Sequence, residues 1–308
     1  MIPEGLVPAI DAALENAGSV VAEAERLHQR YRDGGDSWYG DEQGALAYAA
    51  GRMPATAAAV AQAMDMADLP ACRSLLDLGA GTGAAAWAAH ERFVLHQMTL
   101  IERDPAARAI GEQLARSQFT ATWKAGDLRD GEWPNHDLVT AAYSFGELPL
   151  PRLEEVAVAA WSACNVAMVV VEPGTPDGAE VIDTVRTQIL SAGGFIAAPC
   201  THHAACPLRA TDRWCHRMVR VPRARFQRHA KGGSRSYEDE KFSYLIATRQ
   251  PLERPAGRII ITPQIHKGGV CVQVCTEHGI EERRIPRKDA NFKAAKKAAW
   301  GDAWMAGR

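Results

Sequence analysis

Short apolar runs alternate with helix-length stretches through the middle of this 308-residue chain, and this alternation constrains its fold more than any other feature. The apolar runs, typical of buried strands, occupy residues 74–78, 98–102, 138–142 and 166–172. The stretches between them that have helical length are residues 84–91, 106–117 and 153–163. Strands that alternate with helices form a parallel sheet covered on both faces, so we predict an α/β, Rossmann-like fold. Ligands of such sheets bind at the carboxyl ends of the strands.

The rest of the chain divides around this centre. Residues 1–70 form a predicted helical N-terminal region, with amphipathic helices at 4–31 and 45–64, the second crossed by Pro54. Two further strands, at 195–199 and 242–248, complete a domain over residues 71–249, with a cysteine-rich insertion at 200–241. Residues 250–308 form a predicted basic C-terminal extension. It contains a hairpin, with strands at 270–275 and 280–285, and a helix over 289–300.

A glycine-rich turn follows the first predicted strand, in the sequence LLDLGAGTG at 75–83. Gly79, Gly81 and Gly83 allow the main chain to approach a ligand closely, and Asp77 stands two residues before the first of them. Glu102 ends the next strand, where a carboxylate can accept hydrogen bonds from two ribose hydroxyls. A glycine-rich turn alone also occurs at nicotinamide and flavin sites, so a Rossmann dehydrogenase remains the alternative.

Two further positions complete this pattern. Asp127 follows Gly126, where an acid can reach an adenine amino group, and Tyr143 follows the strand at 138–142, where it lines the site or packs in the core. The whole constellation resembles the class I S-adenosylmethionine-dependent methyltransferases. The resemblance implies that Glu102 holds the ribose and Asp127 the adenine. It places the methionine and ribose portion of the donor among Asp77, Gly79, Gly81 and Gly83.

No catalytic group follows from the sequence. The segment AAYSFGELP at 141–149 lacks the Asp/Asn-Pro-Pro-aromatic motif of amino-group methyltransferases, and the Pro-Cys placement of base-carbon enzymes is also missing. Methyl transfer requires a nucleophile aligned with the sulfonium methyl. The sequence therefore supports donor binding better than it supports catalysis.

Seven cysteines accompany a chain without an export signal, which argues against a disulfide framework. Cys72 and Cys164 lie in or beside predicted strands and read as buried apolar groups. Three others fall within 16 polar residues, and two lie on one face of an alternating run: Cys200, Cys206 and Cys215, then Cys271 and Cys275. Thiols concentrated in this way suit zinc or an iron–sulfur cluster. Nearby histidines keep a Cys/His zinc site open, and unliganded cysteines are the remaining alternative.

The net charge of −2 conceals a strong asymmetry. Residues 1–204 carry 13 basic and 27 acidic side chains, whereas residues 205–308 carry 22 basic and 10 acidic ones. A basic third on an acidic body predicts a polyanionic partner, although a solvated basic face is the alternative. The residues that we expect to contact RNA are Arg220, Arg223, Arg225, Lys293, Lys296 and Lys297.

Nearly the whole chain resembles the mitochondrial small-ribosomal-subunit assembly family of methyltransferase-like proteins and its bacterial relatives. Besides the cysteine segment, the resemblance rests on RMPAT at 52–56, LDLGAGTG at 76–83, YSFGEL at 143–148, KFSY at 241–244 and WGD at 300–302. It implies binding of S-adenosylmethionine, a 4Fe–4S cluster and the RNA of the small ribosomal subunit. The implied cluster ligands are Cys200, Cys206, Cys215 and Cys275, with Cys271 as the alternative fourth ligand.

These observations predict a methyltransferase-like protein that acts on or binds small-subunit ribosomal RNA during ribosome assembly. A catalytically silent RNA-binding assembly factor and a small-molecule methyltransferase with a structural zinc are the rival functions. No apolar run approaches the roughly 20 residues that cross a bilayer, so we expect no membrane partner. The first 25 residues contain no Lys or Arg, which predicts neither an export signal nor a transit peptide and hence a cytoplasmic location.

Overall fold

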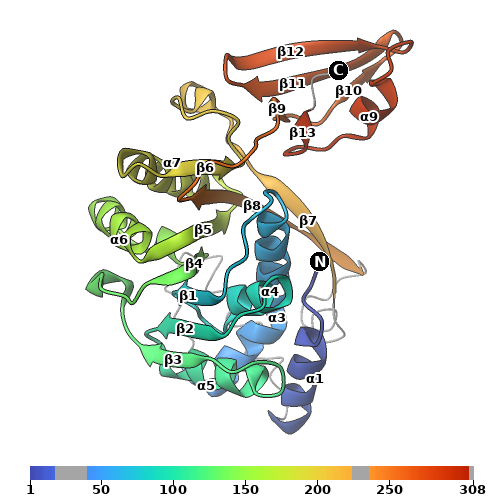
Figure 1. Ribbon diagram of the computed structural model, residues 1–308. Coiled ribbons are helices and arrows are strands. Elements are labelled where there is room, and N and C mark those ends of the chain that lie inside the picture. The colour runs from blue at the N-terminus through green and yellow to red at the C-terminus, as the bar shows by residue number, and fades with distance from the viewer. Residues whose placement is uncertain (18–39, 224–235, 305–308) are drawn as a thin grey trace.

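The central sheet has the predicted alternating architecture. The computed structural model describes residues 1–17, 40–223 and 236–304 of the chain. Within this part, seven strands follow the order β3-β2-β1-β4-β5-β8-β6, and β7 also pairs with β8 to give an eight-stranded sheet (Figure 1). The strands are β1 (Ser74–Leu78), β2 (Gln97–Glu102), β3 (Thr122–Ala125), β4 (His136–Ala142), β5 (Cys164–Pro173), β6 (Phe195–Ala198), β7 (Arg217–Pro222) and β8 (Tyr237–Thr248). β1 to β5 are parallel, whereas β8 is antiparallel to β5 and β6. This topology confirms the Rossmann-like methyltransferase sheet.

Helices cover both faces of this sheet. They are α1 (Leu6–Ala17), α3 (Glu42–Met64), α4 (Ala84–Arg92), α5 (Pro105–Ala115), α6 (Leu150–Ser162) and α7 (Pro176–Ser191). One core cluster joins α3 and α4 to the sheet, and a second joins α6 and α7 to its other face (Figure 1). α1 packs outside, against α3 and α5. Of the predicted helix at 4–31, residues 18–31 lie outside the described part.

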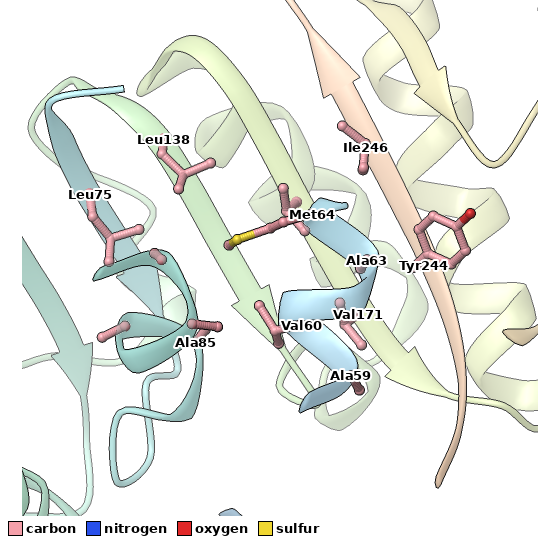
Figure 2. Packing of buried hydrophobic residues seen from close by; sticks show 14 of the residues in the cluster. Ala59, Val60, Ala63, Met64, Leu75, Ala85, Leu138, Val171, Tyr244 and Ile246 are labelled. Carbon is pink, nitrogen blue, oxygen red and sulfur yellow. The ribbon is translucent and has the colours of Figure 1, made fainter. Parts of the chain in front are cut away.

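Helix α3 lies close against the sheet because its buried face consists mainly of small side chains. Figure 2 shows Ala59, Val60 and Ala63 beside the sheet residues Val171 and Tyr244. Alanine lets a helix backbone approach its neighbour closely, and the tight packing contributes dispersion energy. The helix continues through Pro54, which is buried within it. Pro54 lacks a main-chain N–H and therefore removes one helical hydrogen bond.

The edge strand β3 was missing from the sequence expectation, and β8 is longer than expected. In β3, Trp123 is partly buried and the other three residues are exposed, so the strand carries no strong apolar signal. The first half of β8, from Tyr237, pairs with β7 inside the predicted insertion at 200–241. The insertion is thus partly a β-hairpin that extends the main sheet. Three short 3₁₀ turns also occur: η1 (Leu128–Asp130), η2 (Phe145–Glu147) and η3 (Pro207–Ala210).

The C-terminal extension forms its own five-stranded antiparallel sheet within the described residues. Its elements are β9 (Gly257–Ile259), β10 (Gln264–His266), β11 (Gly269–Thr276), β12 (Gly279–Pro286), α9 (Phe292–Lys297) and β13 (Ala303–Trp304). The register of β11 with β12 confirms the predicted hairpin, and the valines of β11 form the core under α9. The predicted helix at 289–300 is shorter, because the Gly301 N–H donates to Ile259 O and β13 then pairs with β9.

Candidate donor and metal-binding sites

The glycine-rich turn begins at the carboxyl end of β1 and has left-handed backbone geometry at each of its three predicted glycines. The φ angles are 66° at Gly79, 55° at Gly81 and 90° at Gly83. A Cβ atom at Gly79 would stand 2.5 Å from Cβ of Ser144, which itself donates a hydrogen bond to Leu78 O at 2.9 Å. Gly79 is therefore required by both backbone conformation and space. The turn and the segment after β4 form one tightly packed edge.

Asp77 lies beneath this turn as a buried carboxylate. Thr140 Oγ1 on β4 donates to Asp77 Oδ1 at 2.7 Å, whereas the buried Oδ2 has no hydrogen-bond partner among the described residues. Burial and the neighbouring Glu102 raise the pKa of Asp77 to about 7. One carboxylate oxygen of Asp77 is thus fixed by the sheet, and the other is a buried acceptor without a hydrogen bond in the described part of the chain.

Glu102 ends β2 and spans the turn. Its Oε2 accepts the Gly81 N–H and its Oε1 accepts the Asp104 N–H, each at 2.8 Å. Burial raises the pKa of Glu102, while these two main-chain donors lower it. A carboxylate has about four lone-pair positions, so each oxygen can still accept one hydroxyl. The side chain stands where the sequence predicted a ribose-binding carboxylate.

Asp127 is held by an arginine instead of standing free. Its Oδ1 accepts Arg129 Nε at 2.8 Å and its Oδ2 accepts Arg129 Nη2 at 2.5 Å. These hydrogen bonds lower the pKa of Asp127 to about 2. The next residue, Leu128, lies 3.5 Å from the position of a Cβ at Gly79, so this segment does reach the glycine-rich turn.

Tyr143 occupies a strained position directly after β4. Its φ of 57° is the only left-handed value at a non-glycine among the described residues. The phenol donates to Glu240 Oε1 on β8 at 2.8 Å, and Arg52 Nη2 of α3 pairs with the same oxygen at 2.9 Å. Burial and the negative charge of Glu240 raise the pKa of Tyr143. The sequence analysis overlooked this network, although Arg52 belongs to one of the quoted motifs.

Glu172 is a second buried carboxylate that the sequence analysis did not single out. It stands near the carboxyl end of β5, is 1% exposed, and accepts the N–H groups of Phe145 and Gly146 at 2.9 and 3.3 Å. Burial raises its pKa to about 8. Its sequence signal was available, because Glu172 ends a predicted strand just as Glu102 does. It fixes the segment after β4 against the glycine-rich turn.

Three of the predicted metal ligands line one cavity of about 350 Å³ beside α7. These are Cys200, which follows β6, Cys206, at the start of η3, and Cys215, which precedes β7. Burial raises the pKa of Cys215, and the nearby thiol of Cys200 raises it further. The insertion thus folds its three thiols toward a shared space.

The fourth cysteine comes from the C-terminal sheet. Cys275 Sγ lies 3.6 Å from His202 Nε2, and Thr201 Oγ1 donates to Cys275 O at 3.3 Å. Burial raises the pKa of Cys275 to about 12, with further contributions from Cys200 and Cys206. Cys271 lies four residues away on β11, roughly 13 Å along a strand, beside Glu282. The structure therefore brings Cys275, and not Cys271, to the other three thiols.

The donor set suits a thiolate-bound metal group in its chemistry. Within residues 1–17, 40–223 and 236–304, however, no three Cys, His, Asp or Glu side chains are close enough to hold a metal ion as they stand. Three of the thiols line one cavity, and the mutual repulsion of such groups as thiolates is what a bound cation would offset. The residues present fit a sulfur-ligated centre by type.

The predicted RNA-binding arginines are largely neutralised. Arg220 forms two hydrogen bonds with Asp239, at 2.7 and 3.0 Å, and stacks on Tyr237. Arg223 lies 3.5 Å from Glu238, in a pair that is mostly buried. Arg225 lies outside the described residues. The acidic run at the start of β8 thus compensates the basic strand β7, which the sequence alone did not reveal.

The predicted lysines behave differently. Lys293, Lys296 and Lys297 of α9 are exposed, whereas Ala295 on the opposite side of the helix is buried against β11 and β12. No carboxylate lies within ion-pair distance of these three lysines in the described part of the chain. Among the described residues, the predicted RNA-binding side chains without an ion pair therefore lie in the C-terminal extension.

The family described as "Mitochondrial small ribosomal subunit Rsm22" matches residues 42–305. The human protein named "Ribosome assembly protein METTL17, mitochondrial" is 27% identical over 287 residues. That alignment covers 83% of this chain but only 61% of the human protein's length, so the chain spans less than two thirds of that relative.

Solved structures that are similar to this chain include methyltransferases. The magnesium protoporphyrin IX methyltransferase of Synechocystis with bound S-adenosylmethionine is 14% identical, with a TM-score of 0.40, and the match covers 76% of this chain and 99% of that one. A TehB-like S-adenosylmethionine-dependent methyltransferase of Corynebacterium glutamicum is 16% identical, also with a TM-score of 0.40, and the match covers 74% and 99% of the two chains.

The comparisons correct the expected location. The composition of the first 25 residues predicts a cytoplasmic location. This prediction is wrong, because both the matching family and the human relative are described as mitochondrial. No helix in the described ranges has the length and apolar character needed to cross a bilayer. The family match extends from α3 to the last strand, and it includes the glycine-rich turn and all five clustered or alternating cysteines. The chain therefore belongs to the mitochondrial small ribosomal subunit Rsm22 family.

Proposed function

We propose that this protein binds S-adenosylmethionine, contains a 4Fe–4S cluster, and acts on or binds small-subunit ribosomal RNA during ribosome assembly. The observation that carries the proposal is the edge where three left-handed glycines lie between two buried carboxylates, Asp77 and Glu102. We also propose residues 1–70, 71–249 and 250–308 as a helical region, a methyltransferase-like domain and a basic extension.

The donor-binding roles follow from the free acceptors at this edge. Glu102 would accept both ribose hydroxyls with its remaining lone pairs, and Asp77 Oδ2 would accept the donor's ammonium group. The absence of a side chain at Gly79 would let the methionine portion approach the main chain of the turn. Asp127 would bind the adenine amino group by exchanging one of its hydrogen bonds with Arg129.

The bound donor would supply an electrophilic methyl group. Tyr143 directly follows β4, but its phenol already donates a hydrogen bond to Glu240. That engagement, together with the missing amino-group methyltransferase motif, favours a second candidate function. In this candidate the protein is an assembly factor whose donor site regulates or stabilises it without methyl transfer.

The cluster would be held by Cys200, Cys206, Cys215 and Cys275. The support is that three of these thiols line one cavity and the fourth approaches it from the other sheet. A metal centre supplies binding energy that stabilises the folded state of the segments that ligate it. Here those segments are the loop after β6 and the strand β11, so the centre would fasten the C-terminal sheet to the main sheet. Zinc is the alternative metal.

The RNA contact would be made mainly by the C-terminal sheet. Lys293, Lys296 and Lys297 are exposed and unpaired among the described residues, unlike Arg220 and Arg223. Lysine contacts with phosphates give affinity without sequence choice. The donor-binding edge then acts on, or senses, RNA that is held by the basic extension.

Calorimetric titration with S-adenosylmethionine tests the proposed donor site. Glu102→Ala should weaken binding about 30-fold, because two hydrogen bonds to a charged group contribute about 2 kcal/mol or more. Glu112→Ala, which removes an exposed carboxylate of α5, is the matched control and should bind normally. Absence of donor binding by the wild-type protein would refute the proposal. Labelled donor with immature small subunits then separates transfer from silent binding.

Anaerobic purification tests the cluster. We expect a brown protein with about four iron atoms and four sulfides per chain. A colourless protein with stoichiometric zinc would instead establish the alternative metal.

A salt titration of RNA binding tests the proposed RNA contact. Replacing Lys293, Lys296 and Lys297 together by Gln should weaken the association and lower the slope of log affinity against log salt concentration by about 3. The double variant Arg220→Gln/Arg223→Gln is the control, and a larger loss there would contradict the assignment.

A further inference from the structure

Two buried arginines flank the four converging cysteines. Arg186 lies on α7 and is 4% exposed, and Arg258 lies on β9 and is 2% exposed. They come from different units, because α7 covers the main sheet and β9 belongs to the C-terminal sheet. Neither was singled out by the sequence analysis.

Both guanidinium groups hold main-chain carbonyls around the cysteine loop. Arg186 Nη2 donates to His202 O at 3.2 Å and to Ala204 O at 2.6 Å, between Cys200 and Cys206. Arg258 Nε donates to Pro199 O at 2.7 Å, and its Nη1 donates to Gly301 O at 3.0 Å. Each arginine therefore fixes the backbone next to a proposed ligand.

These contacts do not neutralise the two positive charges. No carboxylate lies within ion-pair distance of Arg186 or Arg258 in the part of the chain that the structure describes. A buried, unpaired charge costs several kcal/mol, so buried cations are almost always paired with an anion. Arg186 Nε is also buried without a hydrogen-bond partner. Within the described ranges, two buried cations therefore lack an anion, and a donor group of one of them lacks a hydrogen-bond partner.

Arg186 lines the same cavity as Cys200, Cys206 and Cys215. Arg258 holds the carbonyl of Pro199, the residue before Cys200. Thiols become anionic when they bind a metal. Four thiolates around a 4Fe–4S core, or around a zinc ion, leave a net charge of about −2. Two arginines match that charge.

We infer that Arg186 and Arg258 are positioning residues that compensate the negative charge of a thiolate-ligated metal centre, one from each sheet. This inference rests on the proposed function, since it requires the centre to form. Because the cations come from both units, they attract the centre from opposite sides and hold the two sheets together through it. Without the centre, the two buried cations remain uncompensated.

For an iron–sulfur centre, the two arginines should shift the reduction potential in one direction. Reduction adds a negative charge, which nearby cations stabilise, so both arginines raise the reduction potential. Replacing either by Gln should shift the reduction equilibrium about tenfold toward the oxidised form, which is 59 mV for one electron. Loss of the charge should also increase the rate at which a chelator removes the metal.

The experiment uses the full chain purified anaerobically. We would measure iron and sulfide content, the reduction potential, and the rate of metal removal by a chelator for Arg186→Gln, Arg258→Gln and the wild type. Arg186→Lys keeps the charge and should restore the potential in part. Arg249→Gln is the matched control, because Arg249 also holds two carbonyls, Cys164 O and Trp161 O, at the opposite end of β8.

The outcomes separate the two proposals. A wild-type protein without metal would overturn the proposed function, and this inference with it. A wild-type centre whose potential and removal rate are unchanged in both Gln variants would overturn this inference alone. If one Gln variant fails to fold, the other still decides, because each arginine by itself is expected to raise the reduction potential. For a zinc centre, the removal rate takes the place of the potential.

Discussion

The proposed donor-binding edge at the glycine-rich turn (the donor edge) and the cavity lined by three cysteines of the insertion (the cysteine cavity) differ in how their charged groups are paired. At the donor edge, Glu102 and Glu172 accept main-chain N–H groups, and Asp127 is paired with Arg129. At the cysteine cavity, Arg186 and Arg258 are buried without an anion among the described residues. The first region is nearly complete by itself, whereas the second lacks the negative charge that its own cations require.

The difference shows what each ligand would do for the fold. A donor that enters a satisfied edge adds little to the stability of the protein beyond its own binding energy. A metal centre that enters a charge-unbalanced cavity would supply missing interactions between two sheets. Loss of the metal should therefore damage the structure, whereas loss of the donor should not.

The largest expected effect is at the fourth ligand. Cys275→Ser should abolish stoichiometric metal binding and lower the melting temperature by roughly 10 °C. This corresponds to about 4 kcal/mol at 2–4 °C per kcal/mol. Cys271→Ser, on the same strand but beside Glu282, should change neither quantity. Metal analysis and calorimetry check both variants. Equal effects of the two substitutions would show that Cys275 has no special place.

Gly79→Ala should damage the donor edge and leave the cavity intact. The new Cβ would stand 2.5 Å from Ser144 Cβ at a φ of 66°, so we expect a loss of about 2–3 kcal/mol in unfolding free energy. Donor affinity should fall more than tenfold, while metal content stays normal. Gly268→Ala, in the turn before β11, is the control, because an added Cβ there would meet no atom of the described residues within 4 Å. Normal donor binding by Gly79→Ala would place the donor elsewhere.

Glu172→Gln should change how the free energy of unfolding depends on pH, because it replaces a buried carboxylate at the donor edge. The pKa of Glu172 is raised from about 4.5 to about 8, so the folded state holds a proton that the unfolded state releases in this range. Wild-type stability should fall as pH rises from about 4.5 to 8, by at most about 1.4 kcal/mol per pH unit. The Gln variant lacks this term, so its advantage in urea denaturation should grow with pH and then level off above pH 8. A pH-independent difference would contradict the assignment.

Tyr143→Phe should give the smallest effect. It removes the hydrogen bond to Glu240, which we expect to cost about 1 kcal/mol, because Glu240 keeps its pairing with Arg52. Tyr244→Phe is the comparison at the cavity, since the Tyr244 hydroxyl is buried without a partner among the described residues. In the metal-free protein it should cost less than about 0.5 kcal/mol. Urea midpoints measure both, and a larger cost at Tyr244 would reverse the contrast.

Sequence patterns predicted most of the central sheet, because buried strands and amphipathic helices leave periodic apolar signals. β1, β2, β4 and β5 lie where short apolar runs predicted strands. The edge strand β3 was missed because three of its four residues are exposed. The glycine spacing and Glu102 predicted the edge that we propose as the donor site, since the turn and the carboxylate are local features. Asp127 was found, but its pairing with Arg129 depends on side-chain conformation.

The sequence by itself determined the alternating sheet, the glycine-rich turn and the supply of thiols, because each depends on residues close together in the chain. Only the tertiary structure decided that Cys275 and not Cys271 joins the insertion, and that β8 neutralises Arg220 and Arg223. It also decided that Arg186 and Arg258, which lie among apolar residues in the sequence, are buried beside the thiols. Charge pairing depends on the tertiary structure, because the partner of a buried charge can lie anywhere along the chain.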